Sequence, residues 1–199
     1  ACPANVPYGK ILEQTRHQHV ATGRAKTPWS LKLAAALAAR PSLFNLAMLP
    51  ARLMRRWGIL PHRLLFAGSP SLAHSTATYA EELMRTHRPT GPRVALLTGC
   101  LMEAVFREIN FATVRVLIEN NVQVFVPREQ GCCGAMQEHL GLNGVEQLRE
   151  HNHKAFTGAG VDAVVANSSG CGLATSKALH GDVPVRDVLD FLGELPLKQ

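Results

Sequence analysis

Four cysteines in the second half of the chain have the number and setting expected for the ligands of one metal site. Cys100, the adjacent pair Cys132 and Cys133, and Cys171 are each flanked by glycine, and residues 101–131 and 134–170 lie between them. Four thiolates are the usual ligand set of a tetrahedral zinc ion or an iron–sulfur cluster. A single cysteine is most simply an inert buried residue, but four in the same setting favour a site.

The pattern of apolar residues predicts which elements hold these cysteines. After Pro92, short apolar runs predict strands, and runs with helical spacing predict helices. The expected elements are strands at 94–97, 122–126 and 163–166 and helices at 102–120, 143–157 and from about Gly172 onward. This alternation predicts an α/β fold in which helices cover a small parallel sheet. Each predicted strand is followed by cysteine, and parallel strands end at one edge, so the four thiols can converge there.

The residues beside the cysteines agree with a site but leave its chemistry open. Flanking glycines allow sharp turns and expose N–H groups to sulfur, and Ser168 and Ser169 next to Cys171 are candidate hydrogen-bond donors. Three chemistries are open: an iron–sulfur cluster, a zinc ion that stabilises a docking scaffold, and thiol–disulfide exchange with Cys132 or Cys133 as the reactive thiol. A disulfide between these two neighbours is strained and ranks below ligation.

The first half of the chain differs in pattern and in charge. Prolines interrupt successive apolar or amphipathic runs between residues 10 and 88 without a strand pattern, so a helical linker is predicted. Basic residues are concentrated there, against only Glu13, Glu81 and Glu82. This excess fits an acidic partner subunit or an anionic membrane surface as well as a solvated helical face. No nucleic acid is expected, because aromatic residues are sparse and no nucleic-acid-binding motif is present.

Composition is that of an ordinary globular protein. Hydrophobic residues make up 46% and charged residues 18% of the 199 residues, and the net charge is +6. The odd count of 5 cysteines, outside any short secreted framework, indicates a reducing, cytoplasmic compartment. No apolar run approaches the roughly 18 residues of a membrane span, and the first residues have no signal-peptide pattern. The absence of a start Met predicts a processed or partial chain.

The cysteine motifs resemble the cysteine-rich CCG domain of heterodisulfide reductase and of the iron–sulfur subunits of several flavin dehydrogenases. That pattern runs from one cysteine through Cys-Cys-Gly to Cys-x-x-Cys. It matches Cys100, residues 132–134 and Cys171, with Ala174 in place of the last cysteine. The resemblance implies that Cys100, Cys132, Cys133 and Cys171 are metal ligands.

Local sequence is similar to the subfamily of glycolate oxidase iron–sulfur subunits, which also lacks the last cysteine. The similar segments are residues 131–135 (GCCGA), followed by His139, and residues 168–172 (SSGCG). His139 is expected to be a surface or hydrogen-bonding residue rather than a ligand. Residues 2–9 (CPANVPYG) resemble the end of a ferredoxin motif, in which Cys2 would be the last ligand of a [4Fe–4S] cluster.

The resemblance implies a division into three parts. Residues 1–9 would be the tail of a truncated ferredoxin-type domain, residues 10–90 a helical linker, and residues 91–199 a CCG domain, with a second CCG domain expected downstream. The implied function is that of an electron-transfer subunit without catalytic residues of its own. A partner flavoprotein would oxidise glycolate or a similar 2-hydroxy acid, and quinone or another acceptor would receive the electrons. The expected location is the cytoplasm or the inner face of the plasma membrane.

Overall fold

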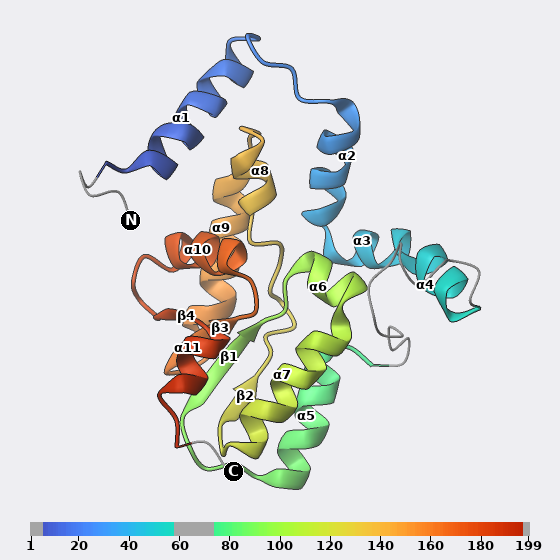
Figure 1. Ribbon diagram of the computed structural model, residues 1–199, viewed down its shortest axis with the longest axis vertical. Helices are drawn as coiled ribbons and strands as arrows, with labels where there is room; N and C mark the ends of the chain where they lie inside the picture. Colours follow the sequence, from blue (N-terminus) through green and yellow to red (C-terminus); the bar gives the residue numbers. More distant parts are fainter. Residues whose placement is uncertain (1–5, 58–73, 197–199) are drawn as a thin grey trace.

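A computed structural model describes residues 6–57 and 74–196 of the chain, and Figure 1 shows their arrangement. In chain order the elements are α1 (Tyr8–Ala21), α2 (Trp29–Ala38), α3 (Pro41–Ala47), α4 (Leu49–Arg56), α5 (Thr76–His87), β1 (Arg93–Leu97), α6 (Cys100–Val105), α7 (Arg107–Glu119), β2 (Gln123–Phe125), α8 (Ala135–His139), α9 (Val145–Thr157), β3 (Ala163–Ala166), α10 (Ser169–Leu179), β4 (Val185–Asp187) and α11 (Val188–Gly193). Helices α1 to α4 are called the arm below, and the elements from α5 onward are called the α/β domain.

The four strands form one parallel sheet in the order β2-β1-β3-β4. β1 is central, because Val94 pairs with Val124 of β2 and with Ala163 of β3. Ala166 of β3 pairs with Asp187 of β4 at the outer edge. The predicted α/β class, with a small parallel sheet covered by helices, is therefore confirmed.

Three local features differ from the sequence-based expectation. The predicted helix 102–120 is two helices, α6 and α7, separated at Phe106, whose φ of −118° and ψ of 30° are not helical. The last long helix begins at Ser169 instead of near Gly172. Strand β4 and helix α11 were not predicted, because β4 is three residues long and only partly buried, without the apolar run that identifies a buried strand.

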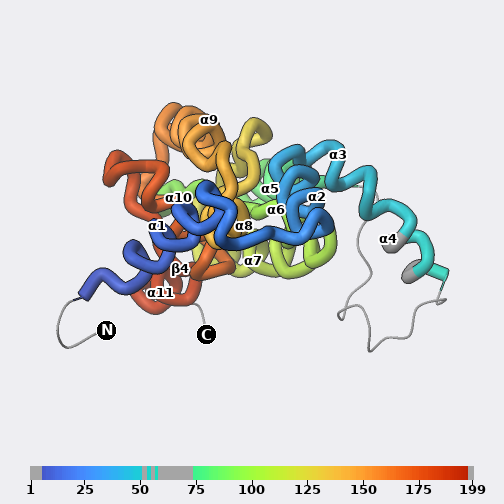
Figure 2. Tube along the Cα trace, turned by 90° about the horizontal axis from the view of Figure 1, so that it is seen from above, coloured from blue at the N-terminus to red at the C-terminus, as the bar shows by residue number. Residues whose placement is uncertain are grey.

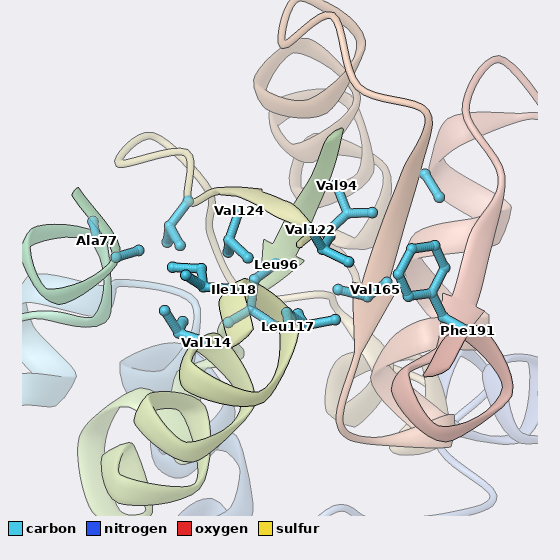
Figure 3. Close-up of a cluster of buried hydrophobic side chains, with 13 residues drawn as sticks. Ala77, Val94, Leu96, Val114, Leu117, Ile118, Val122, Val124, Val165 and Phe191 are labelled. Carbon is cyan, nitrogen blue, oxygen red and sulfur yellow. The ribbon is translucent and has the colours of Figure 1, made fainter. Parts of the chain in front are cut away.

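Alternate residues along the strands supply two hydrophobic cores, one on each face of the sheet. On one face, Val94 and Leu96 of β1 pack with residues of α5, α7 and α11 (Figure 3). On the other face, Ala95 and Leu97 pack with Phe156 of α9 and with residues of α10. The sheet is thus the middle of three layers, and its strand ends are held rigidly at one edge.

Helix α5 lies inside the predicted linker 10–90, yet it is part of the packed core. Its residues Ala77 and Ala80 belong to the same buried cluster as the strands, and Tyr79 stacks on Phe111 of α7 with ring centroids 4.3 Å apart. Figure 1 shows α5 alongside α7. The helical character of the linker agrees with the expectation, but its last helix packs as an element of the α/β domain.

The arm has little buried surface of its own. α2 buries only Ala35 and Ala38, and no residue of α1 or α3 is buried, within the part of the chain that the structure describes. Seen from above in Figure 2, α4 extends away from the rest of the molecule. No helix among the described residues is both long and apolar enough to cross a membrane.

Candidate metal centre

Three strand ends deliver the four cysteines to the carboxyl edge of the sheet. Cys100 follows β1 and is the first residue of α6. Cys132 and Cys133 lie in the loop between β2 and α8, and Cys171 lies in the first turn of α10, after β3. The helix start at Ser169 therefore places Cys171 on a helix rather than on a preceding loop.

Two of the flanking glycines have the backbone conformation that was expected of them. Gly99 has φ 69° and Gly134 has φ 83°, in the region that residues with a side chain rarely adopt, and they precede α6 and α8. Gly170 and Gly172 lie within α10, and neither has a positive φ. Beside Cys100 and Cys133, glycine is therefore needed for its backbone conformation. Beside Cys171 it is not.

The four thiols interact in a row. Cys100 contacts Cys132, Cys132 contacts Cys133, and Cys133 contacts Cys171, each through a side-chain hydrogen bond between sulfurs. Cys132 and Cys133 are buried, with exposed fractions of 2% and 5%, whereas Cys100 and Cys171 are partly exposed. All four are free thiols, so the described chain has no Cys132–Cys133 disulfide.

Protons are unequally shared along this row. Hydrogen bonds from the thiols of Cys100 and Cys133 lower the pKa of Cys132, and a hydrogen bond from Cys133 lowers the pKa of Cys171. The same hydrogen bonds, together with burial, raise the pKa of Cys100 and of Cys133. The direction of the shift at Cys132 and Cys171 favours thiolate, which is the form that binds metal or attacks a disulfide.

Each sulfur also has a donor from the surrounding protein. The backbone N–H groups of Leu101, Gly134 and Ala135 donate to Cys100, Cys132 and Cys133 in that order, and the Ser168 hydroxyl donates to Cys171. Hydrogen bonds to sulfur are a standard means of tuning iron–sulfur and zinc–thiolate centres. The expected role of Ser168 is confirmed, and this donor set fits a thiolate-ligated group.

The side chains as they stand do not surround a single point. Among residues 6–57 and 74–196, no group of three or more His, Cys, Asp or Glu side chains is arranged to hold a metal ion. Interactions nevertheless link all four thiols, since Cys171 also interacts electrostatically with Cys100 and Cys132. The convergence of the thiols is therefore established, and their coordination of a metal stays a prediction.

Three side-chain amides that were not predicted hold the Cys-Cys loop. Gln130 accepts from the Thr98 N–H at 2.9 Å and donates to the Leu96 carbonyl at 3.1 Å. Asn152, which is 1% exposed, accepts from the Gly131 N–H at 2.9 Å and donates to the Cys132 carbonyl at 2.8 Å.

The third amide, Gln137, lies 3.9 Å through Oε1 from the Cys132 sulfur. Gln130 and Gln137 flank the Cys-Cys motif, so their positions in the sequence could have indicated that they support the loop. Asn152 lies within a helix in a distant segment and gave no such signal.

The remaining predicted residues have different outcomes. Cys2 lies outside the described residues. His139 is exposed at the end of α8, where its carbonyl accepts from Arg16, so its expected place on the surface is confirmed. Ala174, where the fuller pattern has cysteine, is buried within α10 with 3% exposed.

Comparison with known families identifies this domain. Residues 94–175 match the family model of the cysteine-rich domain, CCG, and the match contains all four converging cysteines. Residues 94–175 are therefore similar to the CCG cysteine-rich domain, the resemblance that the sequence motifs predicted.

The similar proteins are iron–sulfur proteins and subunits of redox enzymes. A probable glycolate oxidase iron–sulfur subunit of Bacillus subtilis is 30% identical over 198 residues, which cover 90% of this chain and 45% of that protein. The glycolate oxidase iron–sulfur subunit of Escherichia coli is 30% identical over 125 residues, covering 54% of this chain and 31% of that protein. A fumarate reductase (CoM/CoB) subunit of Methanothermobacter marburgensis is 34% identical over 108 residues, covering 52% of this chain and 22% of that protein.

The chain spans less than half the length of each of these relatives. By their names, two of these relatives are iron–sulfur subunits of glycolate oxidase, one of them a probable one, and the third is a subunit of a fumarate reductase. No solved structure gives a significant match.

Proposed function

We propose that the protein is an electron-transfer subunit in which Cys100, Cys132, Cys133 and Cys171 ligate an iron–sulfur cluster. The observation that carries the proposal is the contact of all four sulfurs at one sheet edge, each with its own hydrogen-bond donor. When bound, such a cluster supplies one-electron transfer.

The chain's own residues bind and shield the cluster in this proposal. The donors to sulfur stabilise the thiolate form, and Gln130 and Asn152 fix the loop backbone on which Cys132 and Cys133 lie. Burial of these two cysteines limits the access of water, while Cys100 and Cys171 lie nearer the surface. Electrons would thus enter or leave the cluster on the side of the partly exposed Cys100 and Cys171.

The proposed complex follows from the relatives. Two of them are glycolate oxidase iron–sulfur subunits, so we assign substrate oxidation to a partner flavoprotein that converts glycolate or a similar 2-hydroxy acid to the 2-oxo acid. Quinone or another acceptor would receive the two electrons. In this assignment Cys2 is a ligand of a [4Fe–4S] cluster in a ferredoxin-type domain, and a second CCG domain follows the first.

Anaerobic purification of the chain tests the four-thiol assignment. The proposal expects iron, acid-labile sulfide, visible absorbance and a paramagnetic signal in one redox state. A colourless protein that contains zinc would instead support the stabilised scaffold, and a metal-free protein with a reversible disulfide would support thiol exchange. Either result would overturn the cluster.

Paired variants locate the ligands. Cys132→Ser together with Cys133→Ser should abolish metal content. Cys2→Ser is the matched control, because Cys2 belongs to a separate proposed site, so metal content at the four-thiol site should be unchanged. Equal metal content in both proteins would remove Cys132 and Cys133 from the ligand set.

We also propose that the arm docks on an anionic membrane surface at the cytoplasmic face. Residues 14–80 contain no Asp or Glu but include Lys32, Arg40 and the cluster Arg52, Arg55 and Arg56. Large apolar side chains of the arm are also exposed, including Trp29 at 77% and Trp57 at 67%. Cationic residues beside exposed tryptophan and leucine are typical of helices that lie in a lipid interface.

Vesicle sedimentation tests this docking proposal. The chain should bind vesicles that contain phosphatidylglycerol and should not bind vesicles of phosphatidylcholine alone. Arg52→Glu, Arg55→Glu and Arg56→Glu together should weaken binding at least tenfold. Absence of binding to the anionic vesicles would overturn the membrane assignment. A partner subunit would then be the surface on which the arm docks.

A further inference from the structure

The backbone pairing of β1 with β3 stops short of Cys100 and Cys171, the two cysteines at the ends of the thiol row. The last pair of the register is Leu97 opposite Ala166. Beyond this pair the two chains enter separate helices, α6 and α10, whose first turns carry Cys100 and Cys171. The separation of these two thiols therefore depends on side chains at the strand ends.

A fully buried amide joins the two chains at this point. Asn110 of α7 is 0% exposed, and its Nδ2 donates to the Thr98 carbonyl at 3.1 Å and to the Glu103 carboxylate at 3.3 Å. Its Oδ1 accepts from Nδ2 of Asn167 at 3.1 Å. Thr98 and Asn167 are the first residues after β1 and β3, so Asn110 bridges the two strand ends directly after their last backbone pair.

Both ends of the bridge are held by further polar contacts. Asn167 accepts through Oδ1 from the hydroxyl of Thr113, at 3.0 Å and one turn along α7 from Asn110. Glu103 accepts from the backbone N–H and the hydroxyl of Thr76, and it forms an ion pair with Arg107. Because unpaired polar groups in a buried setting are costly, these contacts keep the Asn110 amide in one orientation.

We propose that Asn110 is a positioning residue that sets the separation of Cys100 and Cys171 and so fits these two thiols to one cluster. A metal site needs its ligands held to within about 0.5 Å by side chains that packing and hydrogen bonds lock in place. Gln130 and Asn152 hold the loop of the inner pair, and Asn110 has the equivalent role for the outer pair. The inference rests on the proposed function and deepens it by naming a residue on which the geometry of that site depends.

Alkylation of the metal-free protein tests the positioning separately from metal binding. The rate of reaction with iodoacetamide is measured for each cysteine by mass spectrometry. Asn167→Ala removes the bridge at its less buried end, so Cys100 and Cys171 should react several-fold faster than in the wild-type protein. Unchanged rates would overturn the positioning role, whether or not the site binds a cluster.

A core truncation on the same helix is the matched control. Val114 of α7 is 0% exposed and packs in the hydrophobic core, so Val114→Ala lowers stability without removing a contact of the bridge. The alkylation rates of Cys100 and Cys171 should then equal those of the wild-type protein. A rise as large as that in Asn167→Ala would show that general loss of stability, rather than the bridge, controls the thiols.

Anaerobic loading with Fe²⁺ and sulfide tests the consequence for the cluster. In Asn167→Ala the affinity for iron, measured by competition with a chelator, should fall about 10- to 100-fold, as is usual when a contact that orients a ligand is lost. The paramagnetic spectrum and the reduction potential should change as well, whereas Val114→Ala should keep both. Wild-type affinity and spectrum in a loaded Asn167→Ala protein would overturn the inference and leave the cluster proposal intact.

A double variant shows whether the two asparagines act as one bridge. Asn110→Leu removes the same contact from its other end, so the protein with both changes should lose no more affinity for iron than Asn110→Leu alone. Additive losses would overturn the bridge. If Asn110→Leu does not fold, Asn167→Ala decides by itself. Failure of the wild-type protein to bind iron would overturn the proposed function and with it the fit to a cluster, an outcome distinct from a bridge that fails in loaded protein.

Discussion

The α/β domain and the arm differ most in how each is held in place. In the domain, every residue of β3 is buried and Phe156 is 0% exposed on one face of the sheet. Helix α1 of the arm buries no residue among those described and lies over a cavity of about 850 Å³ that helices α8, α9 and α10 also line. Apolar packing holds the domain, whereas polar contacts hold α1.

The polar contacts of α1 are specific and few. Lys177 of α10 lies 2.8 Å from the Glu13 carboxylate of α1 and 3.1 Å from that of Glu138. Arg16 donates to the His139 carbonyl at 3.2 Å. Part-exposed ion pairs contribute little free energy each, so the arm is the region whose position ligands, partners and pH can change. The rigid domain carries the thiols, and the weakly held arm carries the charged surface.

The largest expected loss of stability comes from truncating a core side chain of the α/β domain. Phe156→Ala should lower the free energy of unfolding by about 3–5 kcal/mol, because it removes a fully buried ring and leaves a cavity beneath the sheet. Urea denaturation of the metal-free protein measures the change. A loss below about 1 kcal/mol would contradict the assignment of this ring to a packed core.

A smaller loss is expected from the amide that holds the Cys-Cys loop. Asn152→Ala should cost about 1–3 kcal/mol, since the Gly131 N–H and the Cys132 carbonyl lose buried partners. Bound iron should fall in the same variant. Gln147→Ala, at an exposed glutamine of the same helix α9, is the control and should leave both quantities unchanged.

Acid should loosen the contacts of α8, where Glu138 pairs with Lys177 of α10 and Arg149 of α9, before it affects the sheet. Burial acts to raise the pKa of Glu138, but hydrogen bonds and charges from Lys177 and Arg149 outweigh it and hold this pKa below its ordinary value. A carboxylate with a lowered folded-state pKa stabilises the folded state above its ordinary pKa, and the effect is lost as pH falls through the folded-state value.

Amide exchange of α8 and of the start of α9, corrected for intrinsic rates, should therefore accelerate relative to that of β1 as pH falls below about 4. The change corresponds to about 1 kcal/mol or less, because Lys177 is partly exposed. Lys177→Met should accelerate exchange of α1 at neutral pH, whereas Lys154→Met, which removes an exposed pair with Glu150, should not. Equal acceleration of α1 and β1 would refute a separately held arm.

The smallest effect on stability is expected at the surface of the arm. Trp29→Ala should change the free energy of unfolding by no more than about 0.5 kcal/mol, because the side chain is 77% exposed. Binding to anionic vesicles should nevertheless weaken, which separates a docking role from a folding role. Unaltered vesicle binding would remove Trp29 from the docking surface.

Much of the α/β domain could be predicted from the sequence. Strands β1 and β3 contain uninterrupted apolar runs, and the helices between them have a clear helical period. These patterns were enough to predict the class of fold and the convergence of the four cysteines. Strand β4 could not be predicted, since Val185 and Arg186 become a strand only by pairing with Val164 and Val165 of β3. The break at Phe106 also has no sequence signal, because the apolar period continues across it.

The types and spacing of the cysteines determined where a site would form and which residues would compose it. The tertiary structure decided how those thiols interact, with proton sharing along a row and a separate donor for each sulfur. It also decided that Asn152 and Gln137 support the site and that Asn110 joins the ends of β1 and β3. The physical reason is that the order of elements and the apolar pattern are local properties of the chain. Hydrogen bonds between a loop and distant helices exist only after the sheet and its covering helices have brought them together.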